Sequence, residues 1–511
     1  ISPDGRYIVY VLKNGELQSL WVRQVATRSD IQVLAPSAVA FVGVTFSPDG
    51  NYIYFVRSDT GTANYRYLFV MPSLGGNPQQ IAKDVDSLPT FSPDGSQMIF
   101  ARGVPGKGTD FILINKDGSQ EKVIKSLNVQ APSTVDWSPD GKLIAYGAVY
   151  VGKDIVFGLE TMNVSNGSIK RIYTSPDPIG ATVWLGDQSG ILGVVNDRKQ
   201  GINQISYFSY PDGKRDRFTA DLSSYAFCCL DITSDDKKVV AVQSNTTSDV
   251  YLMPGGDSSQ ARQVTSGEPI LFAGMGREHI IGVNQRAEML EMNLDGSNPH
   301  PFVTGFDRIQ GVSPCGDRIA ITALKDGLDI WLLDKDGSNP KRLTQIGGVG
   351  NLSCSPDGKT VYFSNGNQVM KVPSSGGNPE TVTELPKNSG FVFFSADGKY
   401  EAVLFGGAEY NFRVRCRVMT VADGKTVNEF DVPLGADQPK FSPDAKAIDY
   451  LFTREGARNV WAQPIAGGVP YKVTNFASGD AFSFAWSPDG KTLLMTRGAV
   501  KSDVVLITNF H

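Results

Sequence analysis

The five residues Phe-Ser-Pro-Asp-Gly at positions 46–50 return unchanged at positions 91–95, and Trp-Ser-Pro-Asp-Gly follows at positions 137–141. Each residue of this phrase suits a tight turn. The proline presets φ, the aspartate accepts hydrogen bonds from nearby backbone N–H groups, and the glycine adopts a left-handed conformation without steric cost. Short apolar runs flank the phrase, as VTF and NYIYFV do around positions 46–50. The stretch therefore predicts a β-hairpin.

The phrase recurs along the whole chain, so internal repetition has to be settled before any other motif is interpreted. Complete or degraded copies are expected to begin at Ser2, Ser47, Ser92, Ser138, Ser234, Ser313, Ser355, Ser395, Ser442 and Ser487. Two gaps of double length contain eroded copies, WLGDQSGILGVV from Trp184 and FAGMGREHIIGV from Phe272. Ten copies and two eroded ones predict twelve units of about 39 to 49 residues, the size of propeller blades.

Each unit contains four strand-like pieces. Between positions 44 and 83 these pieces are VTF, NYIYFV, YLFVMPS and QQIA, separated by the Ser-Pro-Asp-Gly turn, a polar loop and a Gly-rich turn. Second pieces such as KLIAYG and DRIAIT are apolar on both faces, as expected of strands packed between neighbouring sheets. No long helical period is present. We expect an all-β fold of tandem β-propellers with four-stranded antiparallel blades, twelve blades in total.

The ends of the repeats indicate how twelve blades are divided. The last unit has three strand-like pieces and no fourth, and a Gly/Ser-rich stretch, PGGDSSQ, follows the third piece of the sixth unit. The next segment, ARQVT at positions 261–265, is expected to close a second ring by pairing with DVVLIT of the twelfth unit. We prefer two six-bladed rings, residues 1–257 and 258–511, the first closed by a strand upstream of Ile1. One continuous ring is the alternative.

Composition limits the function classes. The 54 Gly and 29 Pro residues suit a turn-rich all-β protein, and the net charge of −5 with no basic tract argues against nucleic acid as a partner. No apolar run has the length of a membrane span. Because the chain begins inside a repeat, we expect it to be part of a longer protein, with any signal peptide or anchor lying upstream.

The repeated turn with its flanking strands resembles the TolB-like, WD-type propeller repeats of bacteria. A narrower resemblance involves the segments WSPDGKTLLMTRGAVKSDVVLITNF and ISPDGRYIVYV, which look like propeller regions attached to bacterial membrane-bound serine/threonine protein kinases. That resemblance implies a non-catalytic sensor region, periplasmic or otherwise extracytoplasmic and possessing no kinase motif of its own. Propellers have many functions, so the resemblance specifies the fold more than the activity.

Catalytic and metal-binding patterns are scarce. The chain has three histidines, of which only His279 lies where a Ser-His-Asp triad could use it, and there is no G-x-S-x-G motif. The segment DKDGSN at positions 334–339 resembles the start of a calcium loop but lacks the glutamate at the twelfth position. We expect no catalytic residue, no metal site and no cofactor. We interpret the recurring aspartates as turn formers.

The five cysteines show no zinc spacing. Cys315 and Cys354 occupy similar places in consecutive units, so their side chains could approach each other and form a disulfide. Buried or partly exposed free thiols are the alternative, and the sequence leaves both open.

A cation recurs just after the second strand-like piece of several units, a placement that the turn chemistry does not require. Tyr65, Tyr67, Tyr410 and Phe412 accompany some of these cations, and arginine with aromatic residues is a favoured combination at interfaces. The predicted ligand-binding residues are Arg57, Arg102, Arg198, Arg286, Lys325, Arg454 and Arg497.

On this basis we expect a binding or sensing module that takes a protein, a peptide or a small anionic ligand on its loop face. The alternatives are a free periplasmic scaffold like TolB in an envelope complex, an enzyme with its active site in a ring channel, and a solvated charged rim without a ligand.

Overall fold

The computed structural model describes residues 1–59, 65–104, 107–130, 132, 134–151, 155–175, 177–197, 200–366, 368–384, 391–406, 414–433, 435–508 and 510. Strands account for nearly all of the regular structure, and the one helix in these ranges is a 3-10 turn, η1 (Ser258–Gln260). No helix in the described part of the chain combines the length and apolar character that a membrane crossing needs. The expected all-β fold is confirmed.

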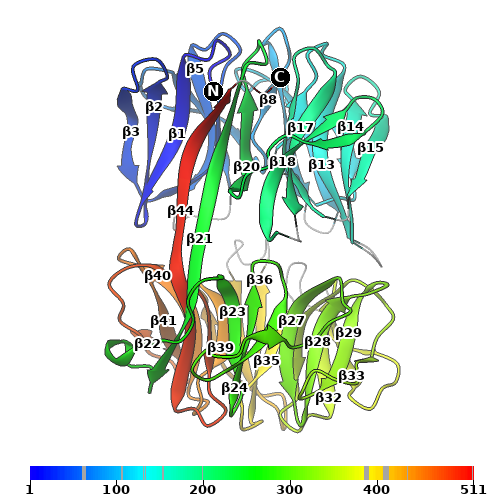
Figure 1. Cartoon of the computed structure of the whole chain (residues 1–511), viewed down its shortest axis with the longest axis vertical. Coiled ribbons are helices and arrows are strands. Elements are labelled where there is room, and N and C mark those ends of the chain that lie inside the picture. Colours follow the sequence, from blue (N-terminus) through cyan, green and yellow to red (C-terminus); the bar gives the residue numbers. More distant parts are fainter. Residues whose placement is uncertain are drawn as a thin grey trace. The chain divides into compact units, whose positions relative to one another are not determined.

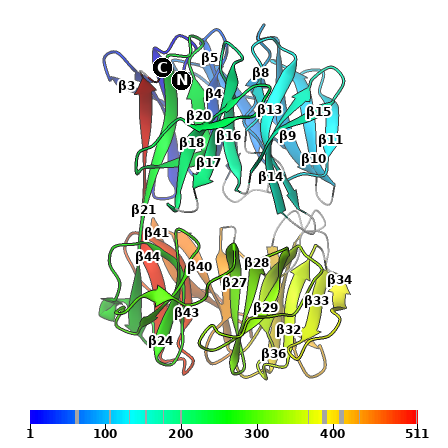
Figure 2. The ribbon, with the colours of Figure 1, turned by 45° about the vertical axis from the view of Figure 1, so that its right-hand side comes forward.

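The chain forms two compact units. The first contains Ile1–Val151, Val156–Asn245 and the residues from Lys501 onward, and the second contains Thr246–Val500. Within each unit the sheets stand side by side, as Figure 2 shows for β16, β17 and β18 beside β20, and for β27 and β28 beside β32.

In the first unit, consecutive strands pair antiparallel into one three-stranded sheet followed by four-stranded sheets. The sheets, in chain order, are β1 (Tyr7–Asn14), β2 (Leu17–Gln24) and β3 (Asp30–Ser37); β4 (Val39–Phe46), β5 (Tyr52–Asp59), β6 (Tyr67–Pro72) and β7 (Gln79–Lys83); β8 (Thr90–Phe91), β9 (Gln97–Val104), β10 (Gly108–Asn115) and β11 (Lys122–Leu127); β12 (Asp136–Trp137), β13 (Leu143–Val151), β14 (Ile155–Asn163) and β15 (Ile169–Ser175); β16 (Ile179–Trp184), β17 (Gly190–Asp197), β18 (Ile202–Ser209) and β19 (Arg215–Arg217).

The second unit repeats the four-stranded arrangement. Its sheets, in chain order, are β23 (Ile270–Met275), β24 (His279–Asn284), β25 (Met289–Asn293) and β26 (His300–Pro301); β27 (Arg308–Cys315), β28 (Arg318–Leu324), β29 (Leu328–Asp334) and β30 (Lys341–Arg342); β31 (Val349–Cys354), β32 (Thr360–Asn365), β33 (Gln368–Pro373) and β34 (Glu380–Glu384); β35 (Phe391–Phe394), β36 (Tyr400–Gly406), β37 (Val414–Thr420) and β38 (Thr426–Asp431); β39 (Asp437–Phe441), β40 (Ala447–Arg454), β41 (Ala457–Pro464) and β42 (Tyr471–Lys472).

Apolar cores lie between neighbouring sheets. Tyr54, Val56 and Leu68 of one sheet, for example, pack against Met98 and Phe100 of the next. Because each second strand is covered on both faces, its sequence is apolar on both faces, as the sequence pattern predicted. The neighbouring four-stranded antiparallel sheets form a β-propeller architecture, as expected.

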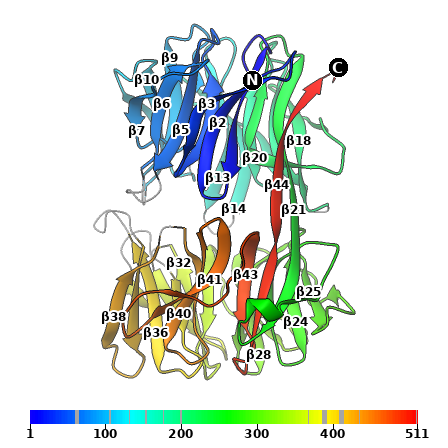
Figure 3. The ribbon, with the colours of Figure 1, turned by 90° about the vertical axis from the view of Figure 1, so that its left-hand side faces the viewer.

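One further sheet contains strands from both ends of the chain, in the order β20 (Ser224–Ile232), β21 (Lys238–Pro254), β44 (Thr492–Thr508) and β43 (Asp480–Trp486), with β22 (Arg262–Gln263) on β21. Figures 1 and 3 show the two long strands β21 and β44 side by side. The first half of β21 pairs with β20, and the first half of β44 pairs with β43. Each long strand then continues into the other unit.

The crossing of β21 and β44 between the two units shows that the second ring is not closed in the way that was expected. Arg262 and Gln263 pair with Leu252 and Tyr251 of β21, not with DVVLIT, whose residues belong to the first unit. The sequence did not indicate the exchange because a strand that crosses between units has the same apolar pattern as two separate strands. The chain passes between the compact units after Asn245 and again after Val500, whereas one passage at 257/258 was expected. The counts of six blades in each ring and twelve in total stay predictions.

The Ser-Pro-Asp-Gly turn has the predicted chemistry. At positions 138–141 the Ser138 hydroxyl donates to Asp140 Oδ1 at 2.7 Å, the Lys142 N–H donates to the same oxygen at 3.1 Å, and Gly141 has φ of +76°. The same hydroxyl-to-carboxylate bond is present at Ser2, Ser47, Ser92, Thr233, Ser355, Ser395, Ser442 and Ser487.

Three expected copies need correction. The copy assigned to Ser234 begins one residue earlier, because Thr233 supplies the hydroxyl and Asp236 adopts the left-handed conformation with φ of +55°. The copy at Ser313 is not this turn. There the strand continues through Pro314 to Cys315, which pairs with Arg318 across a two-residue hairpin. The eroded copy after Phe272 is equally short, since Met275 pairs with Ile280 and the Gly276 N–H donates to the His279 carbonyl.

A second recurring element, which the sequence analysis missed, joins the third strand of a sheet to the segment that follows it. In the sheet of β29, the Thr344 hydroxyl donates to Asp329 and accepts the Ile330 N–H, at 2.7 and 3.0 Å. Equivalent threonines are Thr219, Thr265 and Thr474, which donate to Gln204, Asp249 and Asn459. Their hydroxyls, buried at Thr219, Thr344 and Thr474, each accept a backbone N–H that would otherwise have no partner.

Candidate binding surface

The structure describes six of the seven predicted ligand-binding cations, and Arg198 lies outside the described residues, as do Tyr410 and Phe412. Four of the six lie in second strands of their sheets, Arg57 in β5, Arg102 in β9, Arg454 in β40 and Arg497 in β44. Arg286 and Lys325 follow β24 and β28 within two residues. The expected position just after the second strand therefore holds for Arg286 and Lys325 only, and a common binding face of the six cations stays a prediction.

Two of these cations are fully engaged by carboxylates. Arg102 donates to Glu121 at 2.7 Å and also to the Asp84 carbonyl at 2.8 Å. Arg286 pairs with Glu268 at 2.9 Å and with Glu288 at 2.8 Å. A guanidinium group with such partners has little capacity left to bind a ligand. These two residues therefore stabilise the structure around their own sheets.

The other four cations lie over aromatic rings. Arg57 lies 4.4 Å from the centre of the Phe69 ring, and Arg497 lies 3.3 Å from that of Phe476. The Arg497 Nη2 also donates to the Ser478 carbonyl at 2.7 Å, and burial lowers the pKa of its guanidinium. A cation on an aromatic face is an intramolecular attraction that requires no ligand. It gives the recurring cation a structural role that the sequence did not reveal.

Lys325 and Arg454 have the most capacity left for a ligand. Both are exposed, and each lies over a tryptophan of the following strand, at 5.7 Å from Trp331 and 5.5 Å from Trp461. Arg454 approaches Glu455 only at 4.0 Å, and Glu455 also pairs with Lys472 at 3.3 Å. These two residues of the second unit present positive charge on an aromatic support.

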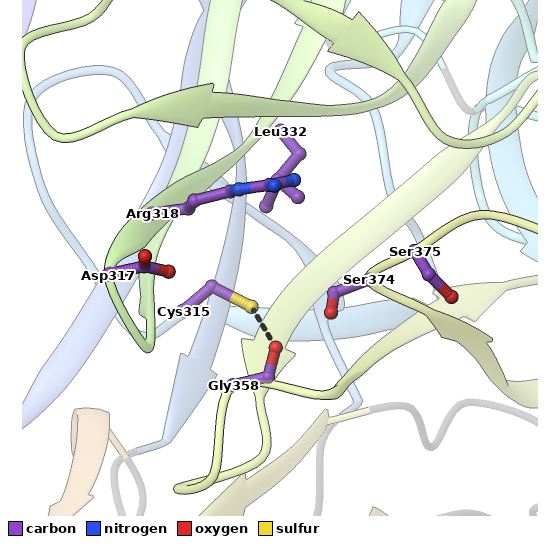
Figure 4. Close-up of a pocket in the computed structure, with 7 residues that line it drawn as sticks. All are labelled: Cys315, Asp317, Arg318, Leu332, Gly358, Ser374 and Ser375. Atoms are coloured by element: carbon purple, nitrogen blue, oxygen red, sulfur yellow. Dashed lines mark hydrogen bonds between the residues drawn. The ribbon is translucent and has the colours of Figure 1, made fainter.

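A small pocket lies beside the shortened hairpin of β27 and β28 (Figure 4). Its volume is about 200 Å³, and it is lined by Cys315, Asp317, Arg318, Leu332, Gly358, Ser374 and Ser375. The hairpin is short enough for Cys315 to meet Cys354 at the end of β31, and the two form a disulfide with their Cα atoms 5.3 Å apart. Of the two alternatives for these cysteines, the structure has the disulfide.

Two ionisable side chains of the second unit lie inside sheets. Asp449 is 1% exposed, accepts the Trp486 indole N–H at 2.8 Å and has a pKa that desolvation raises to about 7. Lys440 is its register partner on β39, donates to the Phe484 carbonyl and has a pKa that desolvation lowers to about 8. Perturbed pKa values are typical of catalytic groups but also of structural ones.

The histidines do not form a triad in the described part of the chain. His279 and His300 both face Glu291, at 3.6 and 3.4 Å. The oxygens of the DKDGSN segment are used within their own turn, since Asp336 accepts the Ser338 N–H and Asp334 accepts from Asn339. Among the described residues no three His, Cys, Asp or Glu side chains are grouped so as to hold a metal ion.

The first third of the chain matches a known family model. Residues 1–157 match the family model of the TolB β-propeller domain. No curated protein matches the chain.

Among solved structures, a protein assigned as TolB in Agrobacterium tumefaciens aligns with 18% identity and a TM-score of 0.37, over 57% of this chain and 89% of that one. TolB from Acinetobacter baumannii aligns with 14% identity and a TM-score of 0.31, over 73% of this chain and 82% of that one. The tricorn protease aligns with 14% identity and a TM-score of 0.35, over 94% of this chain, which spans about half (54%) of that protein.

Proposed function

We propose that this chain is a non-catalytic binding and sensing module that takes an acidic protein segment, an acidic peptide or a small anionic ligand on the loops after its second strands. The observation that carries the proposal is the pair of exposed cations Lys325 and Arg454, each lying over a tryptophan, with Glu455 no closer to Arg454 than 4.0 Å.

The chemistry of this pair fits an anionic ligand. The indole faces hold the cations near the surface and reduce the entropy lost when a ligand is bound. The guanidinium of Arg454 offers paired donors to a carboxylate or phosphate, and the Lys325 ammonium adds a point charge. Arginine and tryptophan are also the residues that most often dominate binding energy at protein interfaces.

A charge-removal experiment tests the proposal. The probe is a fluorescein-labelled hexaglutamate peptide, titrated into the wild-type protein and into Lys325→Ala/Arg454→Ala at low salt and at 0.5 M NaCl. We expect the double variant to lose about tenfold or more in affinity at low salt, the wild-type protein to lose affinity at high salt, and the melting temperatures of the two proteins to agree closely.

Arg286→Ala is the matched control, because its guanidinium is already held by Glu268 and Glu288. It should lower the melting temperature and leave peptide affinity unchanged. Equal peptide affinity in the wild-type protein and the double variant would reject the site.

The biological setting that we propose is extracytoplasmic attachment to a bacterial serine/threonine protein kinase, supported by the resemblance of the first and last segments of the chain. A free envelope scaffold is the second candidate, supported by the match of residues 1–157 to the TolB propeller domain. The gene sequence upstream of Ile1 separates them. A kinase domain followed by an apolar helix would support the first candidate, and a secretion signal directly before the repeats would support the second.

An enzyme is the third candidate, and the perturbed pKa values of Asp449 and Lys440 are the observation in its favour. A screen of hydrolase and lyase substrates with the wild-type protein and Asp449→Asn addresses it. Turnover that disappears in Asp449→Asn would replace the non-catalytic proposal.

A further inference from the structure

The Ser-Pro-Asp-Gly turns of neighbouring sheets contact each other. The proline of one turn lies against the glycine of the next, so that a Cβ added at Gly141 would be 3.5 Å from Pro93 Cδ, and one added at Gly398 would be 3.4 Å from Pro356 Cγ. The same contact joins Pro48 to Gly95 and Pro443 to Gly490. A rigid ring against a residue without a side chain gives close packing between sheets at this position.

This contact is interrupted where the short hairpin of β27 and β28 meets the turn that ends at Gly358. Because the hairpin is short, Pro314 lies within β27 as a paired residue. A Cβ added at Gly358 would be 2.7 Å from Gly316 Cα, which stands where the other turns have a proline ring. At this junction the disulfide between Cys315 and Cys354 joins the two sheets, and the pocket of about 200 Å³ lies beside it.

One sulfur of the disulfide faces the pocket. The described residues that line the pocket include Cys315 but not Cys354, and Figure 4 shows the Cys315 sulfur directed toward the space between Arg318 and Ser374. Both cysteines are otherwise buried. The pocket is therefore the route by which a small molecule reaches this disulfide, and it leads to Cys315.

The wall of the pocket has charges of both signs. The exposed side chains of Arg318 and Asp317 supply a guanidinium and a carboxylate, and Ser374 adds a hydroxyl. The Lys341 ammonium donates to the carbonyl of Ser375, another lining residue, at 2.7 Å, which places a second cation next to the wall. The cations fit a ligand carboxylate and Asp317 fits an ammonium, which is the charge pattern of an amino acid. The volume, about 200 Å³, is below the roughly 300–1,000 Å³ of pockets for larger ligands.

We propose that this pocket is a thiol–disulfide exchange site for an amino-acid-sized thiol that has a carboxylate and an ammonium group. The thiolate of the ligand attacks Cys315 Sγ, a bond forms between these two sulfurs, and the bond between Cys315 and Cys354 breaks. The electron pair leaves with Cys354 Sγ, which takes a proton from water. The product has a mixed disulfide on Cys315 and a free thiol on Cys354.

Both sulfurs have a hydrogen-bond acceptor in place for the reduced state. The Thr360 carbonyl lies 3.3 Å from Cys354 Sγ, and the Gly358 carbonyl lies 3.6 Å from Cys315 Sγ. A thiol released from the disulfide can donate to the carbonyl beside it, so that its buried S–H is paired. Exchange also removes the covalent link between the two sheets at the junction where the proline contact is interrupted.

Mass spectrometry of the wild-type protein tests which sulfur is attacked. The protein is incubated with L-cysteine at about pH 8, free thiols are blocked with N-ethylmaleimide, and the modified peptides are identified. We expect cysteine on Cys315 and the maleimide on Cys354. Cys416 is the internal control, because burial raises the pKa of its thiol to about 12 and it should stay unmodified. Cysteine attached mainly to Cys354, or neither cysteine modified, overturns the proposal.

A second arm tests the charge pattern in a variant that cannot re-form the disulfide. Cys354→Ser is treated with L-cystine or with cystamine, which is the corresponding disulfide without carboxylates, and the rate of adduct formation on Cys315 is measured. We expect L-cystine to react about tenfold faster than cystamine, because the cations beside the pocket attract its carboxylates. Equal rates for the two reagents would reject the site.

Arg318→Ala, made in the Cys354→Ser protein, should remove most of the preference for L-cystine. Arg277→Ala is the matched control, because it removes an exposed arginine from the hairpin of β23 and β24 in the preceding sheet, and it should retain the preference. An unchanged preference in Arg318→Ala overturns the assigned role of the pocket. The test uses neither Lys325 nor Arg454, so this proposal and the proposed anion site fail separately.

Discussion

The carboxylates of Asp94 in a Ser-Pro-Asp-Gly turn and of Asp449 inside a sheet have pKa values that are shifted in opposite directions. In the turn at positions 92–95 the Ser92 hydroxyl, helped by the N–H and hydroxyl groups of Ser96, lowers the pKa of Asp94 to about 2. Inside the sheet of β40, desolvation raises the pKa of Asp449 to about 7. One carboxylate is exposed and has several donors, whereas the other is buried and accepts from one indole.

The difference shows that the repeated turn carboxylates and the buried carboxylate change the free energy of unfolding in opposite directions as pH rises. A lowered pKa in the folded state contributes stability that is present above the unfolded value of 3.8 and is lost as pH falls through the folded value. A raised pKa does the reverse, since its contribution is complete below 3.8 and is lost as pH rises toward 7. Turn carboxylates therefore protect the fold at neutral pH, and Asp449 opposes it there.

The largest expected effect comes from a buried carboxylate that has several partners. Asp329 is fully buried and accepts from Arg342 at 2.6 Å and from Thr344 at 2.7 Å. Asp329→Ala leaves the Arg342 charge unpaired and should cost about 3–5 kcal/mol, seen as a lower urea midpoint. Asp397→Ala, at an exposed turn, is the control and should lose much less. Equal losses in the two variants would remove the distinction between turn and interior.

Asp449→Asn tests whether the buried carboxylate lowers the free energy of unfolding as pH rises. Asparagine still accepts from Trp486 but cannot ionise, so the fall in unfolding free energy between pH 4 and pH 8 should become smaller. The reduction is no more than about 4 kcal/mol, since each pKa unit corresponds to about 1.4 kcal/mol. Urea titrations at both pH values measure it. An unchanged pH dependence would mean that Asp449 ionises in the folded protein as easily as in the unfolded one.

Gly141→Val tests the backbone requirement of the turn. Gly141 has φ of +76°, and the nearest atom to an added Cβ is Pro93 Cδ at 3.5 Å, so the cost is conformational more than steric. A β-branched residue in this region should cost about 1–2 kcal/mol or more by thermal melting. Gly141→Asn tolerates the left-handed conformation and should recover most of the loss. If both variants melt alike, the turn does not depend on backbone conformation.

The smallest effect is expected from one turn carboxylate. Asp140→Ala removes the acceptor of the Ser138 hydroxyl and the Lys142 N–H, which should cost about 0.5–1 kcal/mol. Lys142→Ala removes only the exposed ion pair of 3.0 Å and should change the melting temperature less. A protein that melts unchanged as Asp140→Ala but no longer binds the hexaglutamate probe would make this aspartate functional.

The turn chemistry could be predicted because its causes lie within six consecutive residues. The serine, the aspartate and the glycine each act on atoms one to five residues away, so the phrase in the sequence specifies the hairpin. Where the phrase is degraded the prediction was less accurate, as at Thr233 and at the short hairpin of Cys315.

The site could be predicted only in part. The position of the cations followed from the repeat, but their partners are distant in sequence, as Glu268 is from Arg286. The pairing of Thr344 with Asp329 was missed for the same reason, although Thr recurs in the short segments RFT, QVT, RLT and KVT. A cation at a strand end looks the same in sequence whether a neighbouring strand neutralises it or leaves it free.

The exchange of β21 and β44 has a consequence for biosynthesis. Residues 501–508 lie in the first unit, and they leave the ribosome only after the whole of the second unit has been made. Until then the apolar surface of Ala181, Val194 and Val239 lacks Val505 and Ile507, which pack against it in the finished protein. The unit that is translated first is therefore completed last, and this apolar surface is not covered by Val505 and Ile507 until the end of synthesis.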